Sequence, residues 1–184
     1  MRVTGGEYRG RILHTVDDLS VRPATDRVRQ TLFNMLVNRL DFEDLSVLDL
    51  FAGSGSLGIE ALSRGAARAV FIEGDPRAME FIEQNLQQLQ CADRAEVYTL
   101  DAVQYMERSG ATFGLVFADP PYAYPATASL PGIAFSRGIV KPGGYLLIEH
   151  ASALVFEESP LYHIGPVKKF GRTVVTFFTG KEPQ

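Results

Sequence analysis

The sequence predicts an α/β fold: a doubly wound, mostly parallel sheet that ends in an antiparallel hairpin at one edge. From Ser46 onward, short apolar runs alternate with segments of helical periodicity. This alternation is typical of parallel strands covered by helices on both faces. The last two apolar runs are separated only by Phe170-Gly171-Arg172, so they are expected to pair antiparallel. The chain of 184 residues is long enough to bury the core of one such domain.

The N-terminal part of the chain follows a different pattern. Residues 1–14 alternate loosely around the turn pair Gly5-Gly6, which predicts a small β-hairpin. The segment from Arg22 to Leu40 then takes a helical period, and Thr25 or Asp26 can cap its first turn. A hairpin followed by a helix is therefore expected before the alternating part begins.

The alternating part predicts strands and helices in a regular order. In chain order they are strand 46–51, a helix that follows a glycine-rich turn and ends at 65, strand 69–73, helix 76–90, strand 96–100, a short helix at 103–108, strand 113–118, a helix between 128 and 140, strand 143–150, and two strands within 161–178. Ligands of such sheets bind in the crevice at the carboxyl ends of the strands. The residues that carry chemistry are therefore expected at those ends.

Charge is distributed unevenly along the chain. Residues 1–40 hold seven Arg and four acidic residues, whereas residues 41–184 hold 11 basic and 18 acidic residues, and the net charge is −4. A basic end on an acidic body predicts a polyanionic partner. We expect one domain, 1–184, in which a basic extension at 1–40 precedes an α/β core at 45–180. The expected phosphate contacts come from four arginines, Arg9, Arg11, Arg27 and Arg29.

Composition excludes several classes of protein. No apolar run approaches the ~20 residues of a membrane helix, and the first residues lack the apolar core of a signal peptide. The single cysteine, Cys91, cannot form an internal disulfide, which favours a reducing cytoplasm. The three histidines lie far apart, and no Cys/His pair has zinc-ligand spacing. A membrane protein and a metal-dependent enzyme are therefore not expected.

A glycine-rich turn connects the first strand of the core to its helix. Residues 53–58, GSGSLG, fit the pattern G-x-G-x-x-G after a strand and before a helix. Glycines allow a ligand to approach the backbone closely, and the helix N-terminus offers free N–H groups. Glu73 closes the next strand 20 residues after Gly53, where its carboxylate can accept hydrogen bonds from ribose hydroxyls. A tight strand–helix turn and an NAD site remain alternatives at this point.

Two further acids favour a cationic nucleoside over NAD. Asp49 lies inside the first strand, where a negative charge beside a pyrophosphate is unhelpful. Asp101 follows the third strand, where it can accept a hydrogen bond from an adenine amino group. With Glu73, these acids stand at three successive strand ends, a distribution that solvated surface charges explain poorly. S-adenosylmethionine fits this site, because its sulfonium and α-amino groups are positive.

Three segments resemble those of the class I S-adenosylmethionine-dependent methyltransferases: LDLFAGSGSLGIEALSRGA, FIEGD and DPPY. With RPATDRVRQTLFN and GGEYRGR added, the chain resembles one family of them from about Gly5 to Phe178. That family is the RsmD-type methyltransferases, which modify guanine N2 in small-subunit (16S) ribosomal RNA and have a Rossmann-like sheet. The resemblance implies that Arg22 and Thr25 cover the methionine end of the cofactor. The remaining cofactor contacts that it implies are Asp49, Phe51, Ala52, Gly53, Ser54, Gly55, Glu73, Asp101, Ala102 and Asp119.

The stretch Asp119-Pro120-Pro121-Tyr122 ends the fourth strand of the core, and two consecutive prolines keep its backbone stiff. The amine of a base is a poor nucleophile, because its lone pair is delocalised into the ring. Asp119 and the Pro120 carbonyl can accept its hydrogens and aim the lone pair at a methyl group, while Tyr122 can stack on the base. The same motif suits adenine N6 as well as guanine N2. The family resemblance implies these catalytic roles for the four residues.

The chain leaves no room for a separate target-recognition domain. Specificity is then expected from a structured RNA, or an assembling small ribosomal subunit, that presents a splayed base to a monomeric enzyme. Three alternatives remain open. The chain can be another amine methyltransferase, acting on adenine N6 or on a protein glutamine. It can also be a ribosome assembly factor that binds S-adenosylmethionine or RNA without turnover, or, more distantly, a dehydrogenase.

Overall fold

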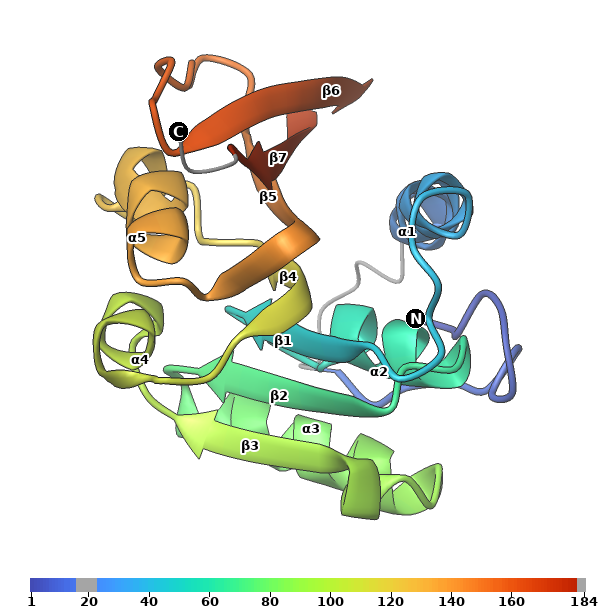
Figure 1. Cartoon of the computed structure of the whole chain (residues 1–184). Helices are drawn as coiled ribbons and strands as arrows, with labels where there is room; N and C mark the ends of the chain where they lie inside the picture. Colours follow the sequence, from blue (N-terminus) through green and yellow to red (C-terminus); the bar gives the residue numbers. More distant parts are fainter. Residues whose placement is uncertain (16–22, 182–184) are drawn as a thin grey trace.

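Seven strands form one sheet in the computed structural model, which describes residues 1–15 and 23–181. The strands are β1 (Ser46–Leu50), β2 (Arg68–Glu73), β3 (Ala95–Thr99), β4 (Phe113–Ala118), β5 (Val140–Ala151), β6 (Tyr162–Phe170) and β7 (Thr173–Gly180). The helices are α1 (Pro23–Leu36), α2 (Ser56–Ser63), α3 (Pro76–Gln88), α4 (Ala102–Arg108) and α5 (Leu130–Ser136), with short 3₁₀ turns at Ala92–Arg94 and Thr127–Ser129. The elements follow one another in the predicted order (Figure 1).

The strand order across the sheet is β3-β2-β1-β4-β5-β7-β6. The first five of these strands are parallel, whereas β7 runs antiparallel to β5 and β6 runs antiparallel to β7. The predicted α/β fold with an antiparallel C-terminal edge is therefore confirmed. The order reverses between β1 and β4, and at such a switch point the carboxyl ends of the strands leave a crevice for ligands.

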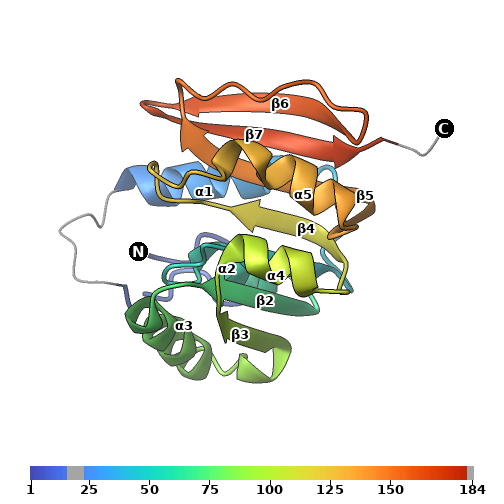
Figure 2. The same cartoon turned by 90° about the vertical axis from the view of Figure 1, so that its left-hand side faces the viewer.

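Helices cover both faces of the sheet. Figure 1 shows α1 and α2 on one side and α4 and α5 on the other, and in Figure 2 the latter pair lies in front of the strands. Phe117 and Leu147 belong to the core cluster under α1, α2 and α3, whereas their neighbours Val116 and Ile148 belong to the cluster under α4 and α5. Successive residues of a strand point to opposite faces. Residues at alternate positions of a strand, which we describe as having the same parity, therefore pack against the helices on the same face.

The N-terminal segment is less regular than the sequence predicts. Instead of a hairpin of two strands, one antiparallel bridge joins Arg2 to Ile12 and closes a series of turns. The segment is fixed by contacts with two helices: the Tyr8 N–H donates to the Ser63 hydroxyl (2.9 Å), and the His14 N–H donates to the Asn85 amide oxygen (2.6 Å). These contacts replace the strand pairing that a longer hairpin would have made.

The first helix begins earlier than the capping residues predict. It starts at Pro23, so Thr25 and Asp26 lie inside its first turn rather than at its cap. Proline is favoured in the first turn of a helix, where its missing N–H has no intrahelical partner to lose. Asp26 instead forms an ion pair with Arg29 one turn later (2.8 Å). Within the described ranges, no helix is both long and apolar enough to cross a membrane.

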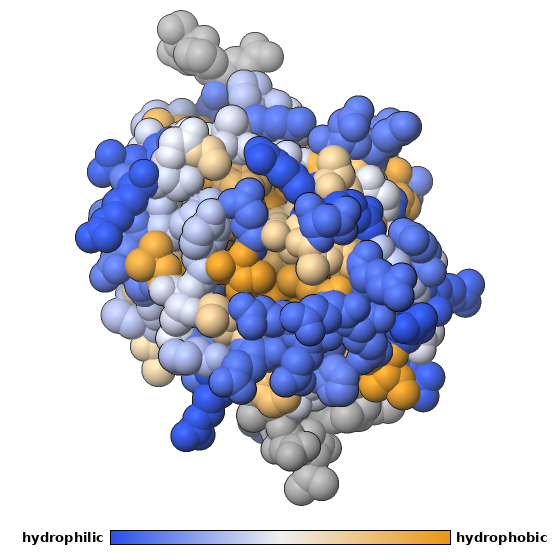
Figure 3. Space-filling view, turned by 90° about the horizontal axis from the view of Figure 1, so that it is seen from below, coloured by the Kyte–Doolittle hydropathy of each residue, from blue (hydrophilic) through white to orange (hydrophobic). Residues whose placement is uncertain are grey.

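The edge strand β3 borders the face shown in Figure 3, where apolar side chains reach the surface within a rim of hydrophilic ones. Its exposed residues are Glu96, Tyr98 and Thr99, and the Tyr98 hydroxyl donates to the Glu96 carboxylate (2.6 Å). Short edge strands with a charged residue resist pairing with another chain. Of the four strands that carry the acids described next, only β2 is next to this edge.

Candidate active site

Four carboxylates stand at the carboxyl ends of four adjacent strands, on the sheet face that α1 and α2 cover. Asp49 pairs in register with Phe117, which pairs with Leu147, and all three strands turn these residues toward the same core cluster. One acid on each strand shares this parity: they are Glu73 on β2, Asp49 on β1, Asp119 after β4 and Glu149 on β5. The structure therefore concentrates negative charge along one edge of the crevice.

Asp49 is the most enclosed of these acids, with 1% of its surface exposed. Its Oδ2 accepts a hydrogen bond from the Gly58 N–H in the first turn of α2 (2.9 Å). Burial raises the pKa of Asp49 well above its ordinary value; the Gly58 bond opposes this, and the charges of Asp119 and Glu73 add to it. A buried carboxylate without a cation is costly, so this strand end is suited to a positively charged ligand.

The glycine-rich turn places its backbone in the left-handed region, with φ of 57° at Gly53 and 76° at Gly55. A Cβ added at Gly53 would meet no atom within 4 Å, whereas one at Gly58 would come within 2.3 Å of the Phe71 ring. Gly58 therefore allows α2 to pack on the sheet, and Gly53 leaves an open side that a ligand can approach. The Glu73 carboxylate holds the turn by accepting the Gly53 N–H (2.7 Å).

Asp101 caps α4 through one oxygen, which accepts the N–H groups of Val103 (2.9 Å) and Gln104 (3.0 Å). Its other oxygen accepts the Tyr124 hydroxyl (2.9 Å). Burial, together with this bond, raises the pKa of Tyr124 to about 12. An adenine amino group would have to share the Asp101 carboxylate with Tyr124. The Tyr124 ring also packs edge-on against Phe51, at 4.8 Å between centroids, so sequence reasoning missed a residue at this end of the site.

The Asp119–Tyr122 stretch follows β4 directly, and the strand ends at Ala118 as the two prolines predict. Burial raises the pKa of Asp119 to about 6. Tyr122 is 69% exposed, and its hydroxyl is hydrogen-bonded to that of Thr173 on β7 (2.8 Å). The Tyr124 N–H donates to the Pro121 carbonyl (2.8 Å) and closes a turn. The structure thus gives an acid with a raised pKa and an exposed aromatic ring on one short, braced loop.

Glu149 is a further residue of the site. It is half-buried on β5 beside Asp119, and it lines two cavities, one of about 100 Å³ with Asp119 and one of about 160 Å³ with Tyr122. Burial raises the pKa of Glu149 to about 7. The Asp119 charge adds to this rise, and the side chain of Thr173 opposes it.

His150, the next residue on β5, points to the opposite face of the sheet, where its Nε2 is hydrogen-bonded to Thr176 (2.8 Å).

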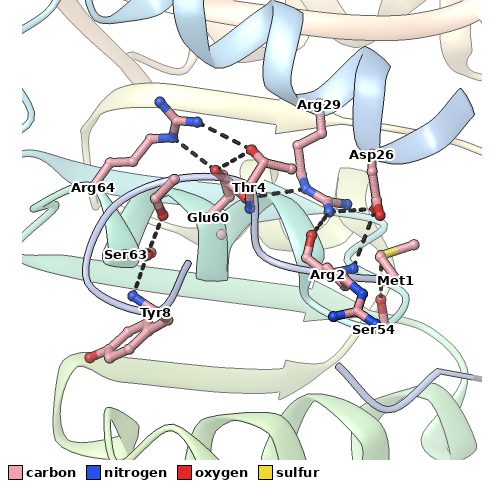
Figure 4. Close-up of polar contacts among 12 residues, drawn as sticks. Met1, Arg2, Thr4, Tyr8, Asp26, Arg29, Ser54, Glu60, Ser63 and Arg64 are labelled. Carbon is pink, nitrogen blue, oxygen red and sulfur yellow. Dashed lines mark hydrogen bonds and ion pairs between the residues drawn. The ribbon is translucent and has the colours of Figure 1, made fainter. Parts of the chain in front are cut away.

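Arg29 does not lie where a phosphate contact requires. Its side chain is 3% exposed and pairs with Glu60 of α2 (3.3 Å) and with Asp26 (2.8 Å), while it also donates to the Arg2 carbonyl (Figure 4). The Glu60 carboxylate is itself fully buried and accepts the Thr4 N–H (2.8 Å). The expectation for Arg29 is therefore corrected: because its guanidinium is paired inside the protein with Glu60 and Asp26, it anchors α1 over the site.

The remaining predicted residues take several positions. Arg9, Arg11 and Arg27 are exposed. The cofactor candidates Ala52, Ser54 and Ala102 lie in the turn after β1 and at the start of α4. Arg22 lies outside the described residues, and Thr25 is part of α1. Within 1–15 and 23–181, no group of three or more His, Cys, Asp or Glu side chains is arranged to hold a metal ion; the acids are spread along four strands instead.

Comparison with known proteins agrees with this geometry. The family described as Conserved hypothetical protein 95 matches residues 1–179. The chain is 37% identical over 153 residues to the putative rRNA methyltransferase YlbH of Bacillus subtilis (strain 168), covering 82% of each chain. It is 44% identical over 122 residues to the ribosomal RNA small subunit methyltransferase D of Escherichia coli (strain K12), covering 66% of this chain and 60% of that one.

A solved structure extends the likeness to the whole fold. The putative methyltransferase yhhF from Escherichia coli superposes with a TM-score of 0.86 and 31% identity, covering 100% of this chain and 99% of that one. The match spans the sheet, the glycine-rich turn and the loop after β4 together, so it is not limited to one motif. The chain therefore belongs to the family described as Conserved hypothetical protein 95 and is a methyltransferase of the RsmD type.

Proposed function

We propose that the chain transfers a methyl group from S-adenosylmethionine to the exocyclic N2 amine of a guanine in small-subunit ribosomal RNA. One observation carries the proposal: four acids, of which Asp49 is buried, line one edge of the sheet beside a stiff loop that ends in an exposed aromatic residue. Acids of this kind favour a cationic cofactor, and the loop suits a flat base with an amine. The names of two relatives, both rRNA methyltransferases, support the choice of substrate.

The residues of the first two strand ends fit S-adenosylmethionine. Its positive sulfonium and ammonium groups would relieve the repulsion around Asp49, and the open side of Gly53 leaves room for its backbone contact. The Glu73 carboxylate and the Asp101 cap lie where ribose hydroxyls and an adenine amine can reach them. When bound, the cofactor supplies an electrophilic methyl group.

The loop after β4 prepares the amine for attack. The Asp119 carboxylate and the Pro120 carbonyl accept the two amine hydrogens, which draws the nitrogen lone pair out of the ring system. Tyr122 supplies the face on which the base stacks, an interaction worth about 1–3 kcal/mol per base. Because transfer needs in-line approach and exclusion of water more than proton chemistry, the stiffness of this loop is its main contribution.

The RNA contacts that we propose come from the exposed arginines of the N-terminal extension, namely Arg9, Arg11 and Arg27. Such contacts fix the position of a polyanion but distinguish bases poorly. The structure of the RNA, in an assembling small subunit, then decides which guanine is presented. The separation of a cofactor-binding core from a small RNA-gripping extension is part of this proposal.

The test is transfer of labelled methyl from S-adenosylmethionine to three acceptors measured in parallel. They are naked small-subunit ribosomal RNA, small subunits from cells that lack this enzyme, and duplex DNA, with the product identified by mass spectrometry of nucleosides. N2-methylguanine in either ribosomal acceptor supports the proposal, and the better acceptor shows what supplies specificity. Label only in DNA, or no transfer despite tight cofactor binding, contradicts it and favours another amine substrate or a non-catalytic role.

A further inference from the structure

The pair of carboxylates at the ends of β4 and β5 points to a second contact with the base. We propose that Glu149 accepts the N1–H of the target guanine while Asp119 accepts a hydrogen of its amine, so that the pair selects guanine over the other bases. This inference rests on the proposed function, because it names the residue that recognises the substrate of that same site. Asp119 prepares the amine for attack, and Glu149 recognises the ring N1–H beside that amine.

The first support is the register of the two strands. Ala118 pairs with Ile148, so the next residues, Asp119 and Glu149, continue the same row on neighbouring strands, which lie about 4.8 Å apart. Both side chains have the parity of Phe117 and therefore face the side of the sheet under α1. Carboxylates on neighbouring strands that face the same side can both reach one edge of a base.

The second support is the connection between Glu149 and the aromatic residue of the loop. The Thr173 hydroxyl is hydrogen-bonded to that of Tyr122 (2.8 Å), and Thr173 lies close enough to Glu149 to oppose the rise in its pKa. Glu149 lines the cavity that contains Asp119 and the one that contains Tyr122. A base stacked on Tyr122 would therefore turn an edge toward both carboxylates.

The third support is the chemistry of the bases. Guanine carries a ring N–H directly beside its exocyclic amine, so its edge offers adjacent donors to two carboxylates. Adenine and cytosine carry a ring nitrogen lone pair in that position, which an ionised carboxylate repels, and uracil has no amine. A glutamine side chain has a carbonyl oxygen beside its amide nitrogen and is rejected for the same reason. Leaving a half-buried acceptor unpaired is costly, which is how a site rejects an analogue that lacks one donor.

The experiment compares Glu149→Gln with wild type. A glutamine side chain can accept a hydrogen bond through its oxygen or donate one through its nitrogen, so it no longer distinguishes an N1–H from a ring nitrogen lone pair. Acceptors are small subunits from cells lacking the enzyme, and binding probes are guanosine and 2-aminopurine riboside, which keeps the amine but has no N1–H. Both nucleosides are titrated into enzyme saturated with S-adenosylhomocysteine. Wild type is expected to prefer guanosine by about tenfold or more, and Glu149→Gln is expected to lose most of this preference.

Two readouts separate recognition from a structural effect. In Glu149→Gln, kcat/KM for small subunits is expected to fall about tenfold or more while the S-adenosylmethionine Kd stays unchanged. Glu158→Gln, an exposed acid on a distant loop, serves as the matched control and should change neither quantity. Thr173→Val should reduce the guanosine preference in part, because Tyr122 loses the hydroxyl that fixes it beside Glu149.

The outcomes distinguish this inference from the function on which it rests. If wild type forms N2-methylguanine and Glu149→Gln keeps the guanosine preference, the inference is overturned and the function stands. If wild type forms N6-methyladenine, or transfers no methyl to small subunits, both are overturned. N2-methylguanine from wild type, combined with the lost preference in the variant, supports both.

Discussion

The Tyr124 hydroxyl donates a 2.9 Å hydrogen bond to the Asp101 carboxylate, which links the loop after β4 to the N-terminus of α4. The two ends of the site are thereby connected: Asp101 lies beside the expected adenine position, and Tyr124 lies two residues after the aromatic that is expected to stack on the base. The Tyr124 N–H also closes the turn at Pro121. Loss of this hydrogen bond should therefore alter the loop after β4.

We expect Tyr124→Phe to lower the free energy of unfolding by about 1 kcal/mol, because a half-buried hydrogen bond is lost while the ring contact with Phe51 is kept. Affinity for S-adenosylhomocysteine should not fall, since an Asp101 oxygen becomes free for the adenine amine. Thermal denaturation and calorimetric titration measure the two effects, with the exposed Tyr98→Phe as control. A large loss of affinity in Tyr124→Phe would show that the hydroxyl itself contacts the cofactor.

Asp119→Ala should separate binding from chemistry. Turnover is expected to fall about 10²- to 10³-fold, the usual effect of removing one group that orients or stabilises the transition state, while cofactor affinity survives. Single-turnover methyl transfer and S-adenosylmethionine titration measure the two quantities. Asp93→Ala, at an exposed acid of the turn before β3, is the control. If binding and turnover are lost together in Asp119→Ala, the division between a cofactor part and a base part of the site is wrong.

Much of this arrangement could be predicted from the sequence because its signals are local. The alternation of apolar runs and helical periods predicts the order of elements, and Asp49, Glu73 and Asp119 follow from their positions in or after strands. Glu149 also stands near a strand end, yet its role depends on being next to Asp119. That adjacency arises from the pairing of β4 with β5, across chain segments that the pattern of either strand alone does not relate.

The interior position of Arg29 was missed for a different reason. Arginine on a helix is usually exposed, so charge alone predicts a surface contact. The spacing of residues in this helix did indicate burial of Arg29. Arg29, Phe33 and Leu36 recur at helical period and share the buried face. A lone acid within the apolar stretch of α2, Glu60, indicated that a buried cation was needed. Only the packing of α1 on α2 shows that these two residues meet.

Arg29→Met is expected to destabilise the fold by about 3–5 kcal/mol, because it leaves the Glu60 carboxylate buried with less of its compensating charge. Arg27→Met, two residues earlier on the same helix but exposed, should stay within about 0.5 kcal/mol of wild type. Arg27→Met should instead weaken RNA binding, and the salt dependence of that binding should fall by an amount that corresponds to about one phosphate contact. Chemical denaturation and RNA titration at several salt concentrations measure both. Equal stability of the two variants would contradict the anchoring role of Arg29.

The raised pKa values of the site predict how stability changes with pH. Asp119 and Glu149 have pKa values of about 6 and about 7 in the folded chain, above the ordinary values of these carboxyls, chiefly because of burial. In the unfolded chain both ionise near pH 4. The unfolded chain therefore loses its protons first, so the stability of the free protein should fall as pH rises from about 4 to about 7.

Cofactor binding should oppose this trend. A positive ligand beside Asp49, whose pKa is raised by burial, favours the ionised form of that acid, so S-adenosylmethionine is expected to raise Tm more at pH 8 than at pH 5. Thermal denaturation across this range, with and without the cofactor, tests the expectation. Glu149→Gln should weaken the pH dependence of the free protein's stability near pH 7, because the group with the higher pKa has been removed. A Tm increase that is the same at both pH values would mean that the bound cation does not contact the Asp49 carboxylate.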